Sequence, residues 1–377
     1  MERSGSPPHV ASGVLVHDGE RSRITRVFVD GRTVIRKEPV GPGARRRLIQ
    51  EREVLVRLRG LPGIAQLLDS PLYPGSLVLA DGGGPDLARR PRPWAVDALL
   101  PFSAALARAV AAMHRRDVLH GDITPANVVV DPDGAPLLVD FALARTFAEI
   151  GPDAGTVARG SAIVGTLRYL APEQTGRTGR PVDQRADLYS LGATLYELAT
   201  GTPPFGSDDP LLLMHDHLAH VPVPASEVAP EVPAALSDVI GRLLEKDPDN
   251  RYQTADGLAH DLEYLTDALG RRSAAPLLIG THDARFRLRP PTQLVGRDAE
   301  TATLTRAFES ALTGGCRAVF VGGGPGVGKT ALVEQLRPVV AAHGGWFVAG
   351  KFDQYRRNLA ASGVHQAFRA LGRLLLA

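Results

Sequence analysis

The sequence has one cysteine, few aromatic residues and no strong excess of either charge. The lone cysteine, Cys316, excludes a framework of disulfide bonds and favours a reducing compartment. We expect no apolar run to approach the roughly 18 residues that a membrane-spanning helix needs. The first residues also lack the apolar segment of a secretion signal. These absences predict a cytoplasmic chain that does not bind a membrane.

The charge balance and the length set further limits. With 43 Lys and Arg against 41 Asp and Glu, the formal net charge of +2 gives no reason to expect a nucleic-acid partner. A chain of 377 residues, 44% of them hydrophobic, is long enough for roughly two domains that each bury a core.

Lysine is scarce, because only four of the 43 basic residues are lysines. Two of them are candidates for phosphate binding: Lys37 ends an apolar strand pattern, and Lys329 lies in a glycine-rich loop. Lysine acts on phosphate as a point charge, whereas arginine imposes a planar fork. The two lysines therefore mark two candidate nucleotide sites.

The stretch 118–130, VLHGDITPANVVV, reads as a strand, a polar loop and a second strand. Its loop places Asn127 five residues after Asp122, and a later apolar run ends at Asp140. Phosphoryl transfer needs a carboxylate that orients and deprotonates the attacking hydroxyl, and oxygen ligands for a metal on the phosphates. Asp122 is predicted to act as the base, and Asn127 and Asp140 as the metal ligands.

These motifs resemble those of the protein kinases, H-R-D-x-x-x-x-N followed by D-F-G. Here they read HGD at 120–122 and DFA at 140–142, and an APE sequence follows at 171–173. The resemblance implies an α+β fold over residues 10–270. This is the bilobal protein-kinase fold, with a small antiparallel-sheet lobe and a helical lobe. It also implies that Asp187 holds the backbone of the catalytic loop and that Arg251 forms an ion pair with the APE glutamate.

The small lobe is predicted from alternating apolar residues over 13–37, which are typical of twisted antiparallel strands. The kinase resemblance places a phosphate-binding loop between the first two strands, where this chain has only Gly19. It also implies that Lys37 binds the α- and β-phosphates of ATP, the alternative being a charge at a strand end.

Helical spacing over 44–58 predicts a helix that faces Lys37. Glu51 is the expected partner of Lys37, because the neighbouring apolar residues then face the core, and Glu53 is the rival. The LVLAD sequence at 77–81 resembles the kinase hinge.

In that hinge, Leu79 would border the adenine pocket, and the backbone of Asp81 and Gly82 would contact the adenine edge. The glycine run 82–84 is alternatively a plain flexible connector.

The segment before the APE sequence resembles a kinase activation segment, in which Thr166 would hydrogen-bond the catalytic Asp122. Gly121 stands where most kinases have an arginine that binds an activation-loop phosphate. The hypothesis that follows is that phosphoryl transfer does not depend on phosphorylation of Thr156 or Ser161. Thr124 replaces a lysine that usually neutralises the transferred phosphate, and an alanine at 142 replaces the D-F-G glycine, so slow transfer is expected.

Three histidines, His215, His217 and His220, invite a metal site. Positions 215 and 217 do not share a helical face, and no cysteine or carboxylate is expected to complete a ligand set. A surface helix is therefore the preferred interpretation.

Residues 271–292 are predicted to be a linker, and 293–377 to be the start of an α/β P-loop NTPase domain. An expected strand over 317–321 is followed by GGPGVGKT, the G-x-x-x-x-G-K-T pattern of phosphate-binding loops. The candidate phosphate-binding groups in this loop are Gly323, Gly326, Gly328, Lys329 and Thr330, with Thr330 also a Mg²⁺ ligand. The alternative is a glycine-rich turn. We expect this second domain to be incomplete.

The whole arrangement resembles bacterial hybrid sensors that join a Ser/Thr-kinase-like domain to a signalling (STAND, AAA-like) P-loop ATPase. It implies a Mg-ATP-dependent serine/threonine kinase in signal transduction, with ATP and Mg²⁺ as cofactors and a protein with Ser or Thr as substrate. Sensor or histidine-kinase domains further along a longer protein are possible partners. A pseudokinase that only regulates the P-loop module, and a nucleotide switch centred on that module, remain open alternatives.

Overall fold

The computed structural model describes residues 13–29, 31–70, 72–147, 167–178, 180–271, 278–283, 296–324 and 327–348, and the single positions 368 and 371. Four residues of the sequence predictions lie outside these described residues: Thr156, Ser161, Thr166 and Gly326.

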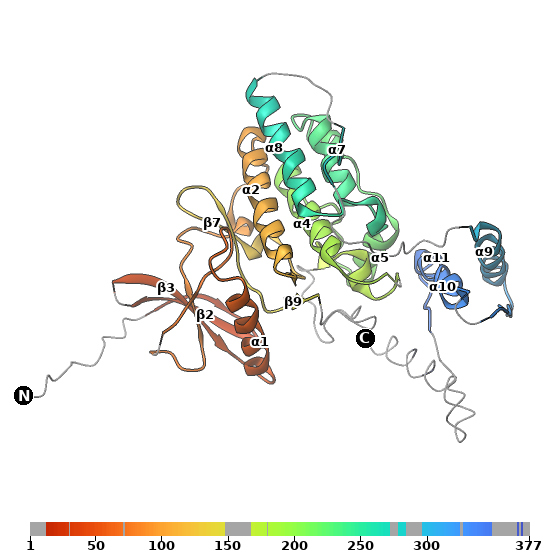
Figure 1. The fold of residues 1–377 in the computed structure, drawn as a ribbon, viewed down its shortest axis with the longest axis horizontal. Helices are drawn as coiled ribbons and strands as arrows, with labels where there is room; N and C mark the ends of the chain where they lie inside the picture. The colour runs from red at the N-terminus through yellow and green to blue at the C-terminus, as the bar shows by residue number, and fades with distance from the viewer. Residues whose placement is uncertain are drawn as a thin grey trace, which may run out of the picture.

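The first lobe is a five-stranded antiparallel sheet with the order β1-β2-β3-β5-β4, and helix α1 (Ala44–Arg57) lies beside it (Figure 1). The strands are β1 (Val14–Asp18), β2 (Ser22–Val29), β3 (Arg32–Pro39), β4 (Leu67–Leu68) and β5 (Leu77–Ala80). Gly31 has a φ of 79° in the tight turn that joins β2 and β3. The small antiparallel-sheet lobe of a kinase fold is confirmed.

The second lobe is a bundle of helices (Figure 1). Its helices are α2 (Val96–Arg115), α4 (Gln184–Thr200), α5 (Pro210–Ala219), α6 (Ala225–Val228), α7 (Ala234–Leu243) and α8 (Ala255–Arg271). Short 3-10 turns complete it: η1 (Leu87–Arg89), η2 (Pro125–Asn127), η3 (Pro172–Thr175) and η4 (Pro248–Asn250). Helix α2 packs along α8 and against α4, so the core helix is flanked by helices from much later in the chain.

Helix α2 is also apolar and long enough to span a membrane by length and composition alone. The expectation that no run reaches this length is therefore wrong. The apolar window is 67% buried within the molecule. Its apolarity reflects its position at the centre of the lobe, because a core helix is covered by other helices on several sides.

Two short antiparallel strand pairs hold the polar loop. Strand β6 (Val118–Leu119) pairs with β9 (Arg145–Thr146), and β7 (Val128–Val130) pairs with β8 (Pro136–Leu138). The predicted order of strand, polar loop and strand over 118–130 is confirmed, and the loop is fixed at both ends.

The second unit contains α9 (Asp298–Leu312), α10 (Lys329–Glu334) and α11 (Leu336–Ala342). The predicted strand over 317–321 is wrong, because the structure assigns no strand within 296–324 or 327–348, and Phe320 is 96% exposed. A parallel strand needs neighbouring strands and cover on both faces, and an apolar run alone provides neither.

The histidine-rich helix α5 differs in part from its prediction. His217 is fully buried, and its Nδ1 lies 2.8 Å from the Tyr189 hydroxyl. Asp216 lies within ligand distance of His215 and His220, so the expectation that no carboxylate completes a set is wrong. Helix α5 ends at Ala219, and His220 folds back to Asp216 at 2.8 Å.

Candidate active site

Lys37 of β3 is the centre of a buried charge cluster. Its Nζ lies 2.8 Å from both carboxylate oxygens of Glu51 in α1 and 2.8 Å from Oδ1 of Asp140. Lys37 is only 4% exposed and Glu51 2%. The interpretation of Lys37 as a strand-end charge is therefore excluded, and the rival Glu53 is exposed on the opposite side of the helix.

The three charges of this cluster shift one another's pKa. Burial alone would lower the pKa of Lys37, but the carboxylates of Asp140 and Glu51 raise it above its ordinary value, so the ammonium stays charged. Burial would likewise raise the pKa of Asp140, but Lys37 lowers it. Burial, the largest cause, raises the pKa of Glu51, although Lys37 opposes this. Of the two carboxyl groups, Asp140 is therefore the one whose pKa favours the charged form that a metal ion needs.

Asp122 lies in the polar loop between β6 and β7, beside Asn127. The Asn127 amide donates to both Oδ2 and the main-chain oxygen of Asp122, each at 2.9 Å. Burial, and next the charge of Asp140, raise the pKa of Asp122 to about 7. A carboxyl group with this pKa suits a general base that works near neutral pH.

Asp140 follows β8 and has a φ of 60°, in the left-handed region that few non-glycine residues adopt. Its Oδ1 accepts hydrogen bonds from Lys37 and from the Ala142 amide. Among the described contacts, Oδ2 of Asp140 and the side-chain oxygen of Asn127 make no such bond. Carboxylate and amide oxygens are the ligands that Mg²⁺ prefers, so these two residues fit a magnesium ion.

Asp187, at the start of α4, fixes the backbone of the polar loop. Its Oδ2 accepts from the His120 amide at 2.9 Å, and its Oδ1 from the Gly121 amide at 2.8 Å. The Nε2 atom of His114 also contacts Asp187, at 2.9 Å. The sequence predicted the role of Asp187 but missed His114, whose only signal is its place in the last turn of α2.

Gln174 links the loop to the segment that follows the APE sequence. Its Nε2 donates to the main-chain oxygen of Gly121 at 2.9 Å, while its Oε1 accepts from the Ala171 amide at 3.0 Å. Gly121 has a φ of 78°, and a Cβ there would lie 3.1 Å from the Leu143 oxygen. Gln174 carries no signal in the sequence, yet it contacts Gly121, the position where most kinases have an arginine.

The hinge connects the two lobes at the end of β5. Leu79 is buried there, and the Asp81 side chain accepts from Arg26 of β2 and from the Gly83 amide. A Cβ on Gly84 would lie 1.7 Å from the Val130 oxygen. The glycine run is therefore packed against the second lobe and is not a plain connector.

Other predicted groups lie near the edges of the site. Gly19 is in the short turn between β1 and β2, where its amide donates to the Ser22 oxygen at 3.1 Å. The Gly19 amide is thus engaged within its own turn. Thr124 is buried and, being a threonine, brings no positive charge to this position.

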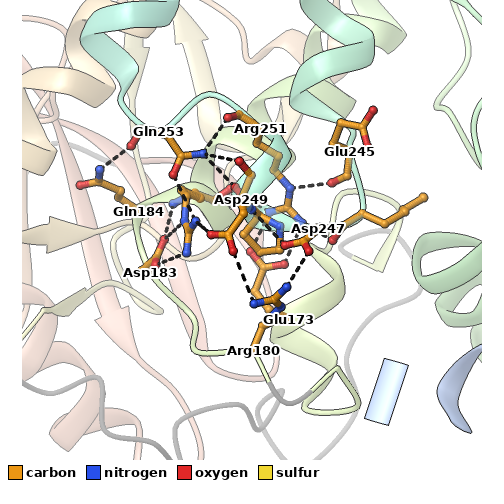
Figure 2. A network of polar contacts seen from close by, with 12 residues as sticks. Glu173, Arg180, Asp183, Gln184, Glu245, Asp247, Asp249, Arg251 and Gln253 are labelled. Carbon is orange, nitrogen blue, oxygen red and sulfur yellow. Dashed lines mark hydrogen bonds and ion pairs between the residues drawn. The ribbon is translucent and has the colours of Figure 1, made fainter. Parts of the chain in front are cut away.

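Glu173 and Arg251 form the expected ion pair, with distances of 2.7 and 2.9 Å between their paired atoms. Figure 2 shows this pair within a wider network that includes Asp249 and Gln253. Arg185 belongs to the same network and lies 2.6 Å from Asp249. Both Glu173 and Arg251 are fully buried. The end of the APE segment is therefore fixed to the loop that precedes α8.

The second lysine lies in a different environment. Lys329 Nζ donates to the main-chain oxygens of Gly323 and Gly324, at 2.9 and 2.7 Å. Gly328 precedes α10 with a φ of 87°, and Thr330 is exposed in its first turn. Lys329 therefore curls over its own loop, and no side chain from another described element fixes it.

Comparisons with known proteins agree with this geometry. Residues 33–262 match the protein kinase domain family, and residues 293–377 match the AAA ATPase domain family.

Individual relatives cover only part of the chain. The serine/threonine-protein kinase PknB of Mycolicibacterium smegmatis is 37% identical over 177 residues, which are 47% of this chain and 28% of that protein. PknB of Mycobacterium tuberculosis is 40% identical over 149 residues, or 40% and 23% of the two chains. The hybrid signal transduction histidine kinase G of Dictyostelium discoideum is 34% identical over 232 residues, which are 56% of this chain and 7% of that protein. The matched region is thus less than a third of each relative.

Proposed function

The chain belongs to the family of protein kinase domains, and on that premise we propose that its first unit phosphorylates serine or threonine in a protein substrate. The observation that carries the proposal is the position of Lys37. Its Nζ contacts both Glu51 and Asp140 at 2.8 Å, so the sheet lobe, helix α1 and the metal-binding acid are already joined. Protein kinases require the lysine–glutamate pair and the metal-binding aspartate to be in place together.

Each group of the cluster has a proposed role. Asp122 accepts the proton of the attacking hydroxyl, and its raised pKa supports this role. Asn127 and Asp140 hold Mg²⁺, which neutralises charge on the phosphates when bound. Lys37 binds the α- and β-phosphates, and Glu51 orients it. The chemistry is positioning and electrostatics, since the chain forms no covalent bond to the phosphoryl group.

ATP use follows from both family matches. For the first unit, the proposed ATP-binding groups are Gly19, Leu79, and the backbone of Asp81 and Gly82. For the second unit, they are the glycines at 323, 326 and 328 with Lys329 and Thr330. We propose that the units are 10–270 and 293–377, joined by 271–292, and that further signalling domains are partners of the whole protein.

A pseudokinase is the second candidate, and two observations favour it. The turn between β1 and β2 contains a single glycine, and its amide is bonded to Ser22. Thr124 also supplies no positive charge to the transferred phosphate. In this alternative the first unit binds nucleotide or a partner and regulates the P-loop module without phosphoryl transfer.

Transfer of labelled γ-phosphate from Mg-ATP separates the two candidates. The wild-type chain is compared with Asp122→Asn and Lys329→Ala, using the chain itself and a generic Ser/Thr protein as acceptors. Transfer that is lost in Asp122→Asn and kept in Lys329→Ala supports a kinase in the first unit. Nucleotide binding without transfer by the wild type supports the pseudokinase.

A further inference from the structure

The segment after α8 folds back onto the beginning of that helix. Asp283 Oδ2 accepts from the Gln253 amide at 2.7 Å, and its Oδ1 accepts from both the amide and the hydroxyl of Thr254 at 2.9 Å. The Asp283 side chain is only 1% exposed. Helix α8 begins at Ala255, and the hydroxyl oxygen of Thr254 caps it by accepting from the Gly257 amide at 3.0 Å. Asp283 therefore holds the capping residue and the residue before it, from beyond the C-terminus of the helix.

Further contacts fix the same segment, 278–283, which we call the docked segment. The Gly280 amide donates to Asp261 at 2.7 Å, and Arg242 of α7 donates to the Ile279 oxygen at 2.8 Å. A Cβ on Gly257 of α8 would lie 2.7 Å from the Asp283 Cα. Glycine is less favourable than alanine inside a helix, and here its lack of a side chain makes room for the docked segment.

Residues 253–254, which Asp283 contacts, also support the end of the APE segment. Gln253 accepts from Arg185 at 3.2 Å and donates to the Arg251 oxygen at 2.7 Å. Arg251 in turn holds Glu173 (Figure 2). A continuous set of hydrogen bonds therefore runs from Asp283 through Gln253 to Glu173.

The docked segment is close in sequence to the second unit. Gly296 follows Asp283 by thirteen positions, and a fully extended chain of that length spans at most about 45 Å. A displacement of the second unit beyond this reach must pull on Asp283. The docked segment therefore lies on the part of the chain that connects the two units.

We infer that the docked segment is an intramolecular coupling contact between the P-loop unit and the kinase unit. When it is docked, Asp283 orders Gln253 and Thr254, and through them the Arg251–Glu173 pair. When the second unit moves, release of Asp283 loosens the end of the activation segment. The effect on phosphoryl transfer rests on the proposed function, whereas the docking contact itself does not. If this inference holds, the kinase unit extends to residue 283, beyond the boundary of 270 proposed above.

Gly257→Ala tests the contact without removing a charge. The new Cβ meets the Asp283 backbone, while alanine strengthens α8. We measure hydrogen exchange of the full chain, resolved for the amides of residues 173–176, 185–186 and 253–254. Hydrogen bonds to a charged acceptor contribute about 1.5–3 kcal/mol. We therefore expect the amides of Gln253 and Thr254 to exchange at least about ten times faster in Gly257→Ala than in the wild type. Smaller increases are expected at the other two stretches.

Gly241→Ala is the matched control, because a Cβ at this exposed position of α7 meets nothing within 4 Å. Asp283→Asn is the second variant and should reproduce the pattern of Gly257→Ala. If exchange at 253–254 is the same in Gly257→Ala and Gly241→Ala, the docking contact is wrong. If exchange becomes faster at 253–254 but not at 173–176 and 185–186, the inferred coupling to the activation segment is wrong.

Action by the second unit is tested by adding Mg-ATP to the wild-type chain and to Lys329→Ala. We expect ATP to change exchange at Gln253 and Thr254 more in the wild type, and identical responses overturn the coupling to the P-loop unit. Labelled phosphate transfer is recorded in parallel. Absence of transfer in every variant contradicts the proposed kinase activity, whereas the exchange rates test the docking contact independently of that activity.

Discussion

The two lysines proposed to bind phosphate are held in opposite ways. Lys37 of β3 is buried and bonded to Glu51 of helix α1 and to Asp140 of the other lobe. Lys329 instead contacts only main-chain oxygens of its own loop among the described residues. The position of Lys37 therefore depends on the fold of the whole domain, whereas the position of Lys329 depends only on the conformation of its own loop.

The largest expected difference between the two lysines is in stability. Lys37→Met leaves the buried Glu51 without its partner, and removing one member of a buried ion pair costs about 3–5 kcal/mol. Lys329→Met removes an exposed local contact and should change the free energy of unfolding by less than about 0.5 kcal/mol. Urea unfolding of both variants measures this, and equal midpoints would contradict the comparison.

The second difference concerns the partner of Lys37. Glu51→Gln keeps the shape of the side chain but removes the charge that orients the ammonium, so we expect transfer to fall about ten- to a hundredfold. Glu53→Gln, two residues away on the exposed face, is the matched control and should leave transfer unchanged. Initial rates of labelled phosphate transfer distinguish them, and a similar loss in both would favour Glu53 as a functional group.

The third difference is in pH dependence. Burial, with Asp140 next, raises the pKa of Asp122 to about 7, and the base must lose its proton to act. We expect kcat/KM to rise about tenfold per pH unit below pH 7 and to level off above it. The P-loop sequence 323–330 has no carboxylate, so its nucleotide binding should lack this transition. A flat wild-type profile between about pH 5.5 and 8 would falsify the assignment of Asp122.

The raised pKa of Asp122 also predicts how stability depends on pH. Asp122 binds its proton more tightly in the folded chain than its ordinary pKa of 3.8 would allow. The folded state therefore holds more protons between about pH 4 and 7, and the contribution of Asp122 to stability falls as the pH rises through that window. Asp122→Asn should remove this decline in unfolding midpoints measured across the window.

The smallest expected effect belongs to Gln174. Gln174→Ala loses hydrogen bonds to Gly121 and Ala171, each contributing about 1 kcal/mol. We expect transfer to fall about three- to tenfold, while nucleotide binding at Lys329 does not change. Gln174→Glu keeps the acceptor for the Ala171 amide but loses the donor to Gly121. An alanine variant with wild-type transfer would show that the loop is positioned without this link.

The same contrast explains what could be predicted from the sequence. Asp122, Asn127 and Asp140 could be found because their spacing within one loop and one hairpin is itself the signal. Glu51 could be chosen over Glu53 because helix periodicity decides which of them faces the core. These groups are specified by local sequence.

Other groups depend on contacts that local sequence does not encode. His114 meets Asp187 across 73 positions, Gln174 meets Gly121 across 53, and Asp283 meets Gln253 across 30. The failed strand over 317–321 has the same origin, because its apolar pattern does not reveal whether partner strands exist. The contacts that could not be predicted are therefore those that depend on tertiary structure.

The apolar helix α2 has a consequence for how the chain is made. It packs along α8, which begins 140 positions after α2 ends. At a synthesis rate of about 5–20 residues per second, roughly seven to thirty seconds pass before α8 emerges to cover the finished helix. During that interval the apolar face of α2 is exposed to water or bound by a chaperone. Translation speed between the two helices therefore sets how long this chain is vulnerable to aggregation.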